Sequence, residues 1–344
     1  MRNQTSISSW NSSRSTVTTL NRAILQQQCS LTRTWKLSVS EMWEQNQIQQ
    51  QGKTMIIDTK DKIGVVLPGG GVKALEAQGA MLQCMLDHDI VPDFAYACSG
   101  GALSGAVYFS RVNFLDLFTT TDANQILKMN QLTSVLSDEG IFSTIGVERL
   151  LGKIMGDRVY KNLVVNMTDI ATHDVYYALG TRSSVIASMS IPKVFPPRIL
   201  NGTVFRPTTP YEYDKPMTCA HETFLLKDRP VYDGGVYDLY PMPDHESIKQ
   251  AKHIFVLCCP TDKSPEEMED NPVLIQAINW ITETMERGFR QMLSAYGGRR
   301  KISILRPKPI EGPMLDWSND FSVYEHSYKY MNNILDNFDM EKLK

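Results

Sequence analysis

The chain has 344 residues, of which 42% are hydrophobic, so it is long and apolar enough to bury the core of one large α/β domain. Its 35 basic and 38 acidic side chains nearly cancel to a net charge of −3, which excludes a global field that would recruit nucleic acid or an anionic membrane. The six cysteines show no CxxC spacing, and no apolar run approaches the roughly 18 residues of a membrane span. We therefore expect a globular, cytoplasmic protein whose membrane contact is peripheral and transient.

The beginning of the chain differs in composition from the rest. The first 40 residues contain no Asp or Glu and are rich in Ser, Thr, Gln and Asn. Residues 1–59 are therefore predicted to be a disordered tail, and residues 60–344 the working domain. An acid-free start with Arg and Ser is also typical of a targeting segment, so organelle targeting is an alternative, and Met55 could begin the working domain.

Strand-like apolar runs alternate with helix-like segments from residue 63 onward. The run IGVVL at 63–67 precedes a helical pattern at 73–86, and the strand-like run at 93–98 precedes another helical pattern at 101–109. Such alternation predicts a mostly parallel sheet with crossover helices. Further strands are predicted at 162–167, 175–180, 229–233 and 253–259.

Several later segments have patterns of their own. Asn201-Gly202 between β-forming residues predicts a hairpin turn. Apolar side chains recur every three or four positions over 273–296, which predicts an amphipathic helix packed on the sheet, with membrane docking as the alternative. Segments 198–229 and 145–156 could form a gate and a lid over a pocket, although ordinary surface packing explains them equally well.

Three consecutive glycines, Gly69, Gly70 and Gly71, lie between the first strand and the first helix. Their N–H groups can converge at a helix N-terminus and bind an anion. Neither phosphate-loop pattern fits, so an oxyanion hole and a tight packing turn remain as interpretations. Lys73 in the first helical turn opposes the helix dipole. It either holds the loop through backbone carbonyls, meets a phosphate, or is simply solvated.

Ser99 follows a predicted strand and precedes a predicted helix. ACSGG resembles the nucleophile elbow GxSxG with Ala97 at the first glycine, and Gly100 and Gly101 would let neighbouring chain pass close by. The competing nucleophile Cys98 ends an apolar strand, where cysteine behaves as a small buried hydrophobe. A Gly-Ser turn without chemistry is the plain alternative.

A serine hydroxyl needs a base. None of the six histidines lies in a glycine-marked turn, whereas VYDGG places Asp233 at a strand end followed by Gly234. Partial burial would bring the pKa of Asp233 closer to working pH, so it is the candidate base. An Asp-Gly turn with no catalytic role is the alternative.

These motifs together resemble the patatin-like phospholipases. The match is to GGGxR/KG, GxSxG and DGG/A, here GGGVKA, ACSGG and DGG, and ASMSIPKVFPP at 187–197 looks like the family element ASxSxPxxFPP. Two positions depart from the pattern: Ala97 in the elbow, and Ala74 where a glycine usually follows the basic residue. Both put the exact loop geometry in question without removing a reacting group.

The resemblance implies a three-layer α/β sandwich and a lipid acyl hydrolase that needs no metal or cofactor. Ser99 would attack the ester carbonyl, Asp233 would accept its proton, and the N–H groups of the triple glycine would hold the oxyanion. The substrate would be a membrane phospholipid or another acyl lipid. Supporting residues are expected to be Lys73, Gly100, Gly101, Pro192 and Gly234.

Two other functions remain open from the sequence. A Ser-Asp-His triad esterase could use His326 as a late base, although it leaves DGG and the 187–197 element unexplained. A catalytically silent lipid-binding protein could keep the pocket without turnover. Nucleic acid is not an expected partner, the oligomeric state is not assigned, and action inside another cell is an alternative to action in the cytoplasm.

Overall fold

The computed structural model describes residues 56–119, 144–209, 220–260, 272–310 and 321–343. The predicted N-terminal tail lies outside these ranges except for residues 56–59. Ile56 and Ile57 are buried, and the Thr59 hydroxyl donates a 2.8 Å hydrogen bond to the Ser247 carbonyl. The folded part of the chain therefore includes residues 56–59, which the sequence had assigned to the tail.

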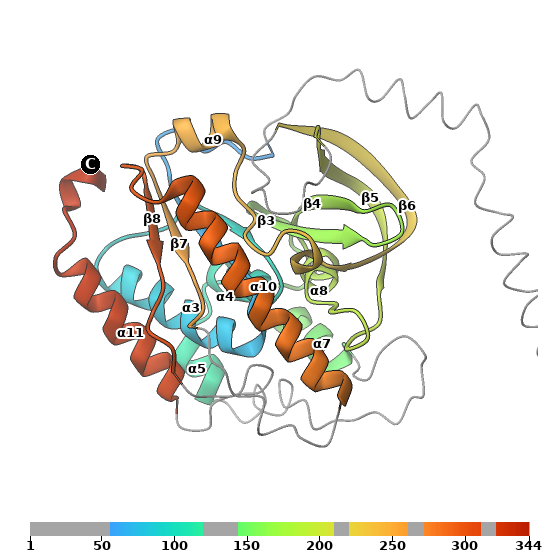
Figure 1. The fold of residues 1–344 in the computed structure, drawn as a ribbon, viewed down its shortest axis with the longest axis horizontal. Coiled ribbons are helices and arrows are strands. Elements are labelled where there is room, and N and C mark those ends of the chain that lie inside the picture. The colour runs from blue at the N-terminus through green and yellow to red at the C-terminus, as the bar shows by residue number, and fades with distance from the viewer. Residues whose placement is uncertain (1–55, 120–143, 210–219, 261–271, 311–320, 344) are drawn as a thin grey trace, which may run out of the picture. The chain divides into compact units, whose positions relative to one another are not determined.

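One mixed sheet with the strand order β4-β5-β6-β3-β2-β1-β7-β8 forms the centre of the fold (Figure 1). Its strands are β1 Ile63–Leu67, β2 Phe94–Ala97, β3 Tyr160–Asp169, β4 Asp174–Gly180, β5 Arg198–Pro207, β6 His221–Asp233, β7 His253–Leu257 and β8 Ile302–Leu305. Strands β3, β2, β1, β7 and β8 are parallel to one another. Strand β3 pairs with both β4 and β6, and β5 also pairs with both of them, each pairing being antiparallel. These four strands therefore form a closed ring of pairings.

Helices lie on both faces of the sheet. They are α3 Gly71–Asp87, α4 Gly100–Phe109, α5 Phe114–Thr119, α7 Ile145–Ile154, α8 Arg182–Ser188, α9 His245–Gln250, α10 Pro272–Tyr296 and α11 Ser322–Leu335, with short 3-10 turns η1 Gly234–Val236 and η3 Met340–Leu343. Side chains alternate between faces along β1: Val65 and Leu67 join the core with α3, α4 and α11, while Val66 joins the core with α10. In Figure 1, α10 crosses in front of the sheet. The predicted three-layer fold is thereby confirmed.

The predicted hairpin at Asn201-Gly202 is wrong. Both residues lie within the single long strand β5, whose register against β6 shifts between Leu200 and Gly202. Gly202 has a φ of 124°, so the conformational freedom that favours a turn is used for a bulge. The Asn201 side chain exchanges hydrogen bonds of 2.9 and 2.7 Å with Asp228 on β6.

Most of segment 198–229, considered above as a gate, forms β5 and β6, and residues 210–219 lie outside the described ranges. The predicted helix at 273–296 is confirmed as α10, and the segment at 145–156 contains α7.

The sheet register brings the three glycine-marked turns together. The turns after β1 and β2 leave neighbouring parallel strands at the same edge. On β3, Val165 pairs with Ala97 of β2, and two residues further on Met167 pairs with Asp233 of β6. Strand β4 pairs with the opposite edge of β3 along this length. Strands β2 and β6 therefore share one edge of β3, and β6 begins to pair there where β2 ends and the chain turns away at Ser99.

Candidate active site

Ser99 lies in the sharp turn between β2 and α4. Its φ of 52° and ψ of −126° are strained for a residue with a Cβ, which is the kind of strain found at functional turns. Its backbone N–H donates a 2.9 Å hydrogen bond to the Ser188 hydroxyl at the end of α8. The side chain is buried, with 5% of the residue exposed. The turn therefore points a serine into the interior, not into solvent.

The glycines after Ser99 allow two turns to touch. A Cβ on Gly100 would lie 2.0 Å from the Gly71 carbonyl oxygen, and one on Gly101 would lie 2.0 Å from the Leu67 carbonyl oxygen. Neither backbone oxygen can give way without moving the loop. The requirement for small residues here is therefore a requirement for contact between the Ser99 turn and the triple-glycine turn.

Asp233 ends β6 beside this turn and is 2% exposed. Its Oδ1 accepts a 2.7 Å hydrogen bond from the Gly235 N–H, while Oδ2 has no hydrogen-bond partner among the described residues. Burial raises the pKa of Asp233 to about 7, and the neighbouring Ser99 hydroxyl partly offsets that rise. The fold thus brings together Ser99 and Asp233, the two residues singled out from the sequence. The Ser99 hydroxyl does not complete a hydrogen bond of normal geometry to the Asp233 carboxylate.

The segment Ser188–Ile191 connects the two turns. Ser188 accepts from the Ser99 N–H, and the Ser190 carbonyl accepts a 2.9 Å hydrogen bond from the Asp233 N–H. Ile191 lines the cavity over the pair. Pro192, the residue of this element singled out from the sequence, is half-buried and is not among the cavity-lining residues.

A buried polar network supports the turn after Asp233. A Cβ on Gly234 would lie 2.2 Å from Asn166 Oδ1, so the glycine is needed for close approach. Asp238 accepts hydrogen bonds from the Tyr177 hydroxyl at 2.5 Å and from Asn166. Burial raises the pKa of Asp238 to about 6. Sequence reasoning missed Asn166 and Tyr177, because neither lies in a glycine-marked turn.

The three glycines Gly69, Gly70 and Gly71 differ in whether their N–H groups have an acceptor. The Gly69 N–H donates a 3.2 Å hydrogen bond to the Leu239 carbonyl and is therefore occupied. Gly70 and Gly71 line the cavity, and their N–H groups donate to no acceptor among the described residues. Both lie at the N-terminus of the 17-residue helix α3, where the helix dipole favours negative charge. Of the three glycines expected to form an oxyanion hole, Gly70 and Gly71 thus keep N–H groups without an acceptor among the described residues, whereas Gly69 does not.

Lys73 is fully buried, which excludes the solvated-lysine interpretation. Its ammonium group donates a hydrogen bond to the Ile310 carbonyl. This contact ties the first turn of α3 to the segment after β8, so the acceptor is a backbone carbonyl, but one outside the glycine loop.

The cavity over Ser99 and Asp233 is only about 10 Å³. Besides the residues already named, Leu239 and the α10 residues Trp280, Ile281 and Thr284 line it. Ligand pockets commonly measure roughly 300–1,000 Å³, so this space admits about one water molecule and no acyl chain. Sequence reasoning assigned α10 to packing on the sheet, with membrane docking as the alternative, and gave no signal that it covers the site.

Competing reactive groups lie elsewhere or are inert. Burial, with Asp233 and Asp238 nearby, raises the pKa of the Cys98 thiol well above its usual value, so it stays protonated. His326 contacts the Lys308 carbonyl at 3.2 Å, and no histidine lines the cavity described above. Within the described ranges, no group of three or more His, Cys, Asp or Glu side chains could hold a metal ion. The helices of those ranges include none long and apolar enough to cross a bilayer.

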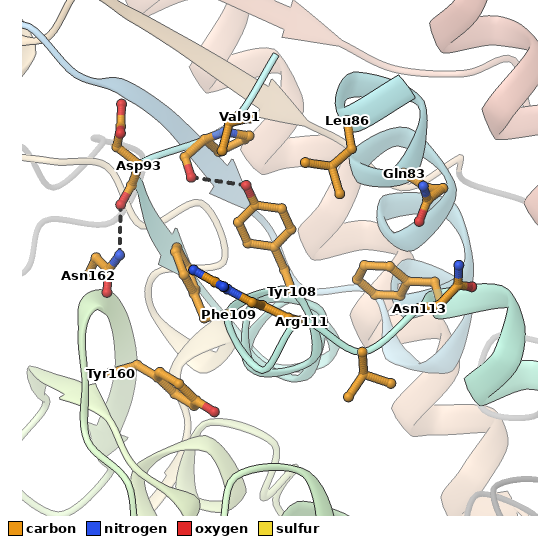
Figure 2. Close-up of a pocket in the computed structure, with 13 residues that line it drawn as sticks. Gln83, Leu86, Val91, Asp93, Tyr108, Phe109, Arg111, Asn113, Tyr160 and Asn162 are labelled. Carbon is orange, nitrogen blue, oxygen red and sulfur yellow. Dashed lines mark hydrogen bonds between the residues drawn. The ribbon is translucent and has the colours of Figure 1, made fainter. Parts of the chain in front are cut away.

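A larger hollow of about 660 Å³ lies at the amino ends of β2 and β3, away from the serine (Figure 2). Two of its polar side chains bond within the fold: the Tyr108 hydroxyl donates to the Pro92 carbonyl, and the Asn162 amide donates to the Asp93 carbonyl, each at 3.0 Å. Size therefore does not identify the candidate site, which is defined by the Ser99 and Asp233 pair.

Fold and site together define an α/β protein with a serine elbow beside a buried carboxylate. The family model described as patatin-like phospholipase matches residues 65–244, more than half of the chain. The chain belongs to the patatin-like phospholipase family. Among solved structures it is similar to VipD from Legionella pneumophila, with 11% identity and a TM-score of 0.39 over 82% of this chain and 67% of that one. No curated protein matches the chain.

Proposed function

We propose that this protein hydrolyses the acyl esters of lipids through Ser99 and Asp233. Asp233 takes the hydroxyl proton while Ser99 Oγ attacks the ester carbonyl carbon. The resulting oxyanion accepts hydrogen bonds from the Gly70 and Gly71 N–H groups. The leaving alcohol, a lysolipid when the substrate is a phospholipid, takes the proton from Asp233 as the tetrahedral intermediate collapses.

The observation that carries this proposal is the shared cavity of a strained, buried serine and a carboxylate whose pKa is raised to about 7. A general base is most effective when its pKa lies near the working pH. The helices α3 and α4 both begin at this cavity, so their dipoles favour the negative charge that develops there. The chemistry proposed uses no metal or other cofactor.

The proposed substrate is a membrane phospholipid or another acyl lipid, reached by peripheral contact from the cytoplasm. In the conformation described, the cavity holds no acyl chain, so binding requires the α10 side chains Trp280 and Ile281 to move aside. Their displacement would open an apolar entrance directly over Ser99.

The test is to incubate the protein with mixed membrane lipids and measure released fatty acids by mass spectrometry. Wild type and His326→Ala should release fatty acid at similar rates, while Ser99→Ala and Asp233→Asn should reduce release by at least about a thousandfold. Circular dichroism should show that all four proteins are folded. Loss of release in His326→Ala alone would support the triad esterase, and lipid retention without release by wild type would support a silent lipid-binding protein.

A further inference from the structure

Thr284 on α10 has an unusual environment. It is 5% exposed, lines the cavity with Ser99 and Asp233, and its hydroxyl oxygen has no hydrogen-bond partner among the described residues. A threonine inside a helix usually satisfies its hydroxyl through a carbonyl three or four residues earlier. Thr284 does not, so its position leaves a buried polar group without compensation.

A second orphaned atom lies in the same cavity. Of the buried side-chain atoms without a partner in the described ranges, only Asp233 Oδ2 and Thr284 Oγ1 belong to residues that line it. The cavity of about 10 Å³ is close to the minimum that holds one water, and a buried water needs two to four polar partners. The Ser99 hydroxyl borders the same space.

We propose that Thr284 Oγ1 and Asp233 Oδ2 hold the water that hydrolyses the acyl-enzyme, an inference that rests on the function proposed above. The water oxygen attacks the carbonyl carbon of the ester on Ser99, and its proton passes to Asp233. When the tetrahedral intermediate collapses, the bond to Ser99 Oγ breaks and Oγ takes that proton back. The product is the free carboxylic acid.

The neighbouring contacts fix this part of α10. The Tyr240 hydroxyl donates a 3.2 Å hydrogen bond to the Met285 carbonyl, and Glu286 forms an ion pair with Arg306. These contacts anchor α10 at the two residues that follow Thr284. It also lies outside residues 65–244, so its role does not follow from the family match.

The test compares Thr284→Val, Thr284→Ser and the matched control Thr282→Val, a half-buried position on the same helix that does not line the cavity. Turnover of p-nitrophenyl butyrate measures the whole cycle, and the rate of labelling by a fluorophosphonate measures attack by Ser99 alone. We expect Thr284→Val to lower turnover at least about tenfold while labelling stays within about twofold. The intact mass of this variant should show accumulated butyryl-enzyme. Thr284→Ser should restore turnover, and Thr282→Val should match wild type.

The inference is overturned if Thr284→Val turns over substrate like wild type, if its labelling falls as much as its turnover, or if Thr284→Ser is as slow as Thr284→Val. Each of these results requires an active wild type. A wild type that neither reacts with the fluorophosphonate nor releases p-nitrophenol would instead refute the proposed function itself.

Discussion

The proposed role of Asp233 as the base predicts that activity depends on pH across neutrality. Its carboxyl must be ionised to accept the Ser99 proton, and burial raises its pKa to about 7. About half of the molecules have the active form at pH 7, and about one in a hundred at pH 5. The value of kcat/KM should therefore rise about fiftyfold between these two pH values and level off above about pH 8.

The same burial makes stability run in the opposite direction. The pKa of an aspartate in the unfolded chain is about 3.9, so the folded state binds the Asp233 proton more tightly. The stability that Asp233 contributes by binding its proton is fully present below about pH 4 and is lost as the pH rises through about 7. The free energy of unfolding should fall by about 4 kcal/mol over this range. Asp233→Asn removes this loss, so above pH 7 the variant should be more stable than wild type by up to that amount. Asp238, with its pKa raised to about 6, remains in both proteins and largely cancels in the comparison.

The assay combines pH–rate profiles for a chromogenic ester from pH 5 to 9 with urea unfolding at pH 5 and pH 8. The matched control is the same Asp-to-Asn change at the exposed residue Asp89, which should leave both curves unchanged. A rate that stays flat down to pH 5, or an Asp233→Asn variant less stable than wild type at pH 8, would refute the reasoning.

Two further substitutions test the geometry of the turns. Gly101→Ala would place a Cβ 2.0 Å from the Leu67 carbonyl oxygen. The shift of about 1 Å needed to relieve this contact should lower ester turnover about a hundredfold. The control is Gly152→Ala on α7, a half-buried position where the added Cβ would meet only the end of the Arg182 side chain, at 3.3 Å; it should leave turnover unchanged, and equal rates for the two variants would contradict the contact. Ser188→Ala leaves the Ser99 N–H without its acceptor, so it should lower the free energy of unfolding by about 1–3 kcal/mol and should also lower kcat. An unaltered urea midpoint and an unaltered kcat would show that this hydrogen bond is unimportant.

The parallel half of the sheet could be predicted from local pattern alone. The strands β1, β2 and β7 are short, apolar and buried on both faces, and glycine-marked turns or helical periodicity follow the first two. Strands β5 and β6 gave weaker signals, because they alternate buried and exposed side chains irregularly. The Asn201-Gly202 pair was misread because its local preference for positive φ serves a bulge as well as a turn.

The candidate site residues Ser99 and Asp233 could be singled out from the sequence for a different reason. Glycines around Ser99 and Asp233 are required by contacts between turns, so the sequence marks those positions even though the partners are distant. The Gly69 hydrogen bond to Leu239 and the approach of Thr284 arise only when segments far apart in the chain pack together. No local pattern encodes such contacts, and the roles assigned to Ser99 and Asp233 stay predictions until they are measured.

Covalent labelling tests the central claim most directly. The purified protein is treated with a fluorophosphonate at pH 8, digested, and the modified residue is located by tandem mass spectrometry. The account predicts a single adduct on Ser99 that forms far more slowly in Asp233→Asn and at wild-type rate in His326→Ala. An unmodified Ser99 in the folded protein, or an adduct whose formation does not depend on Asp233, would contradict it.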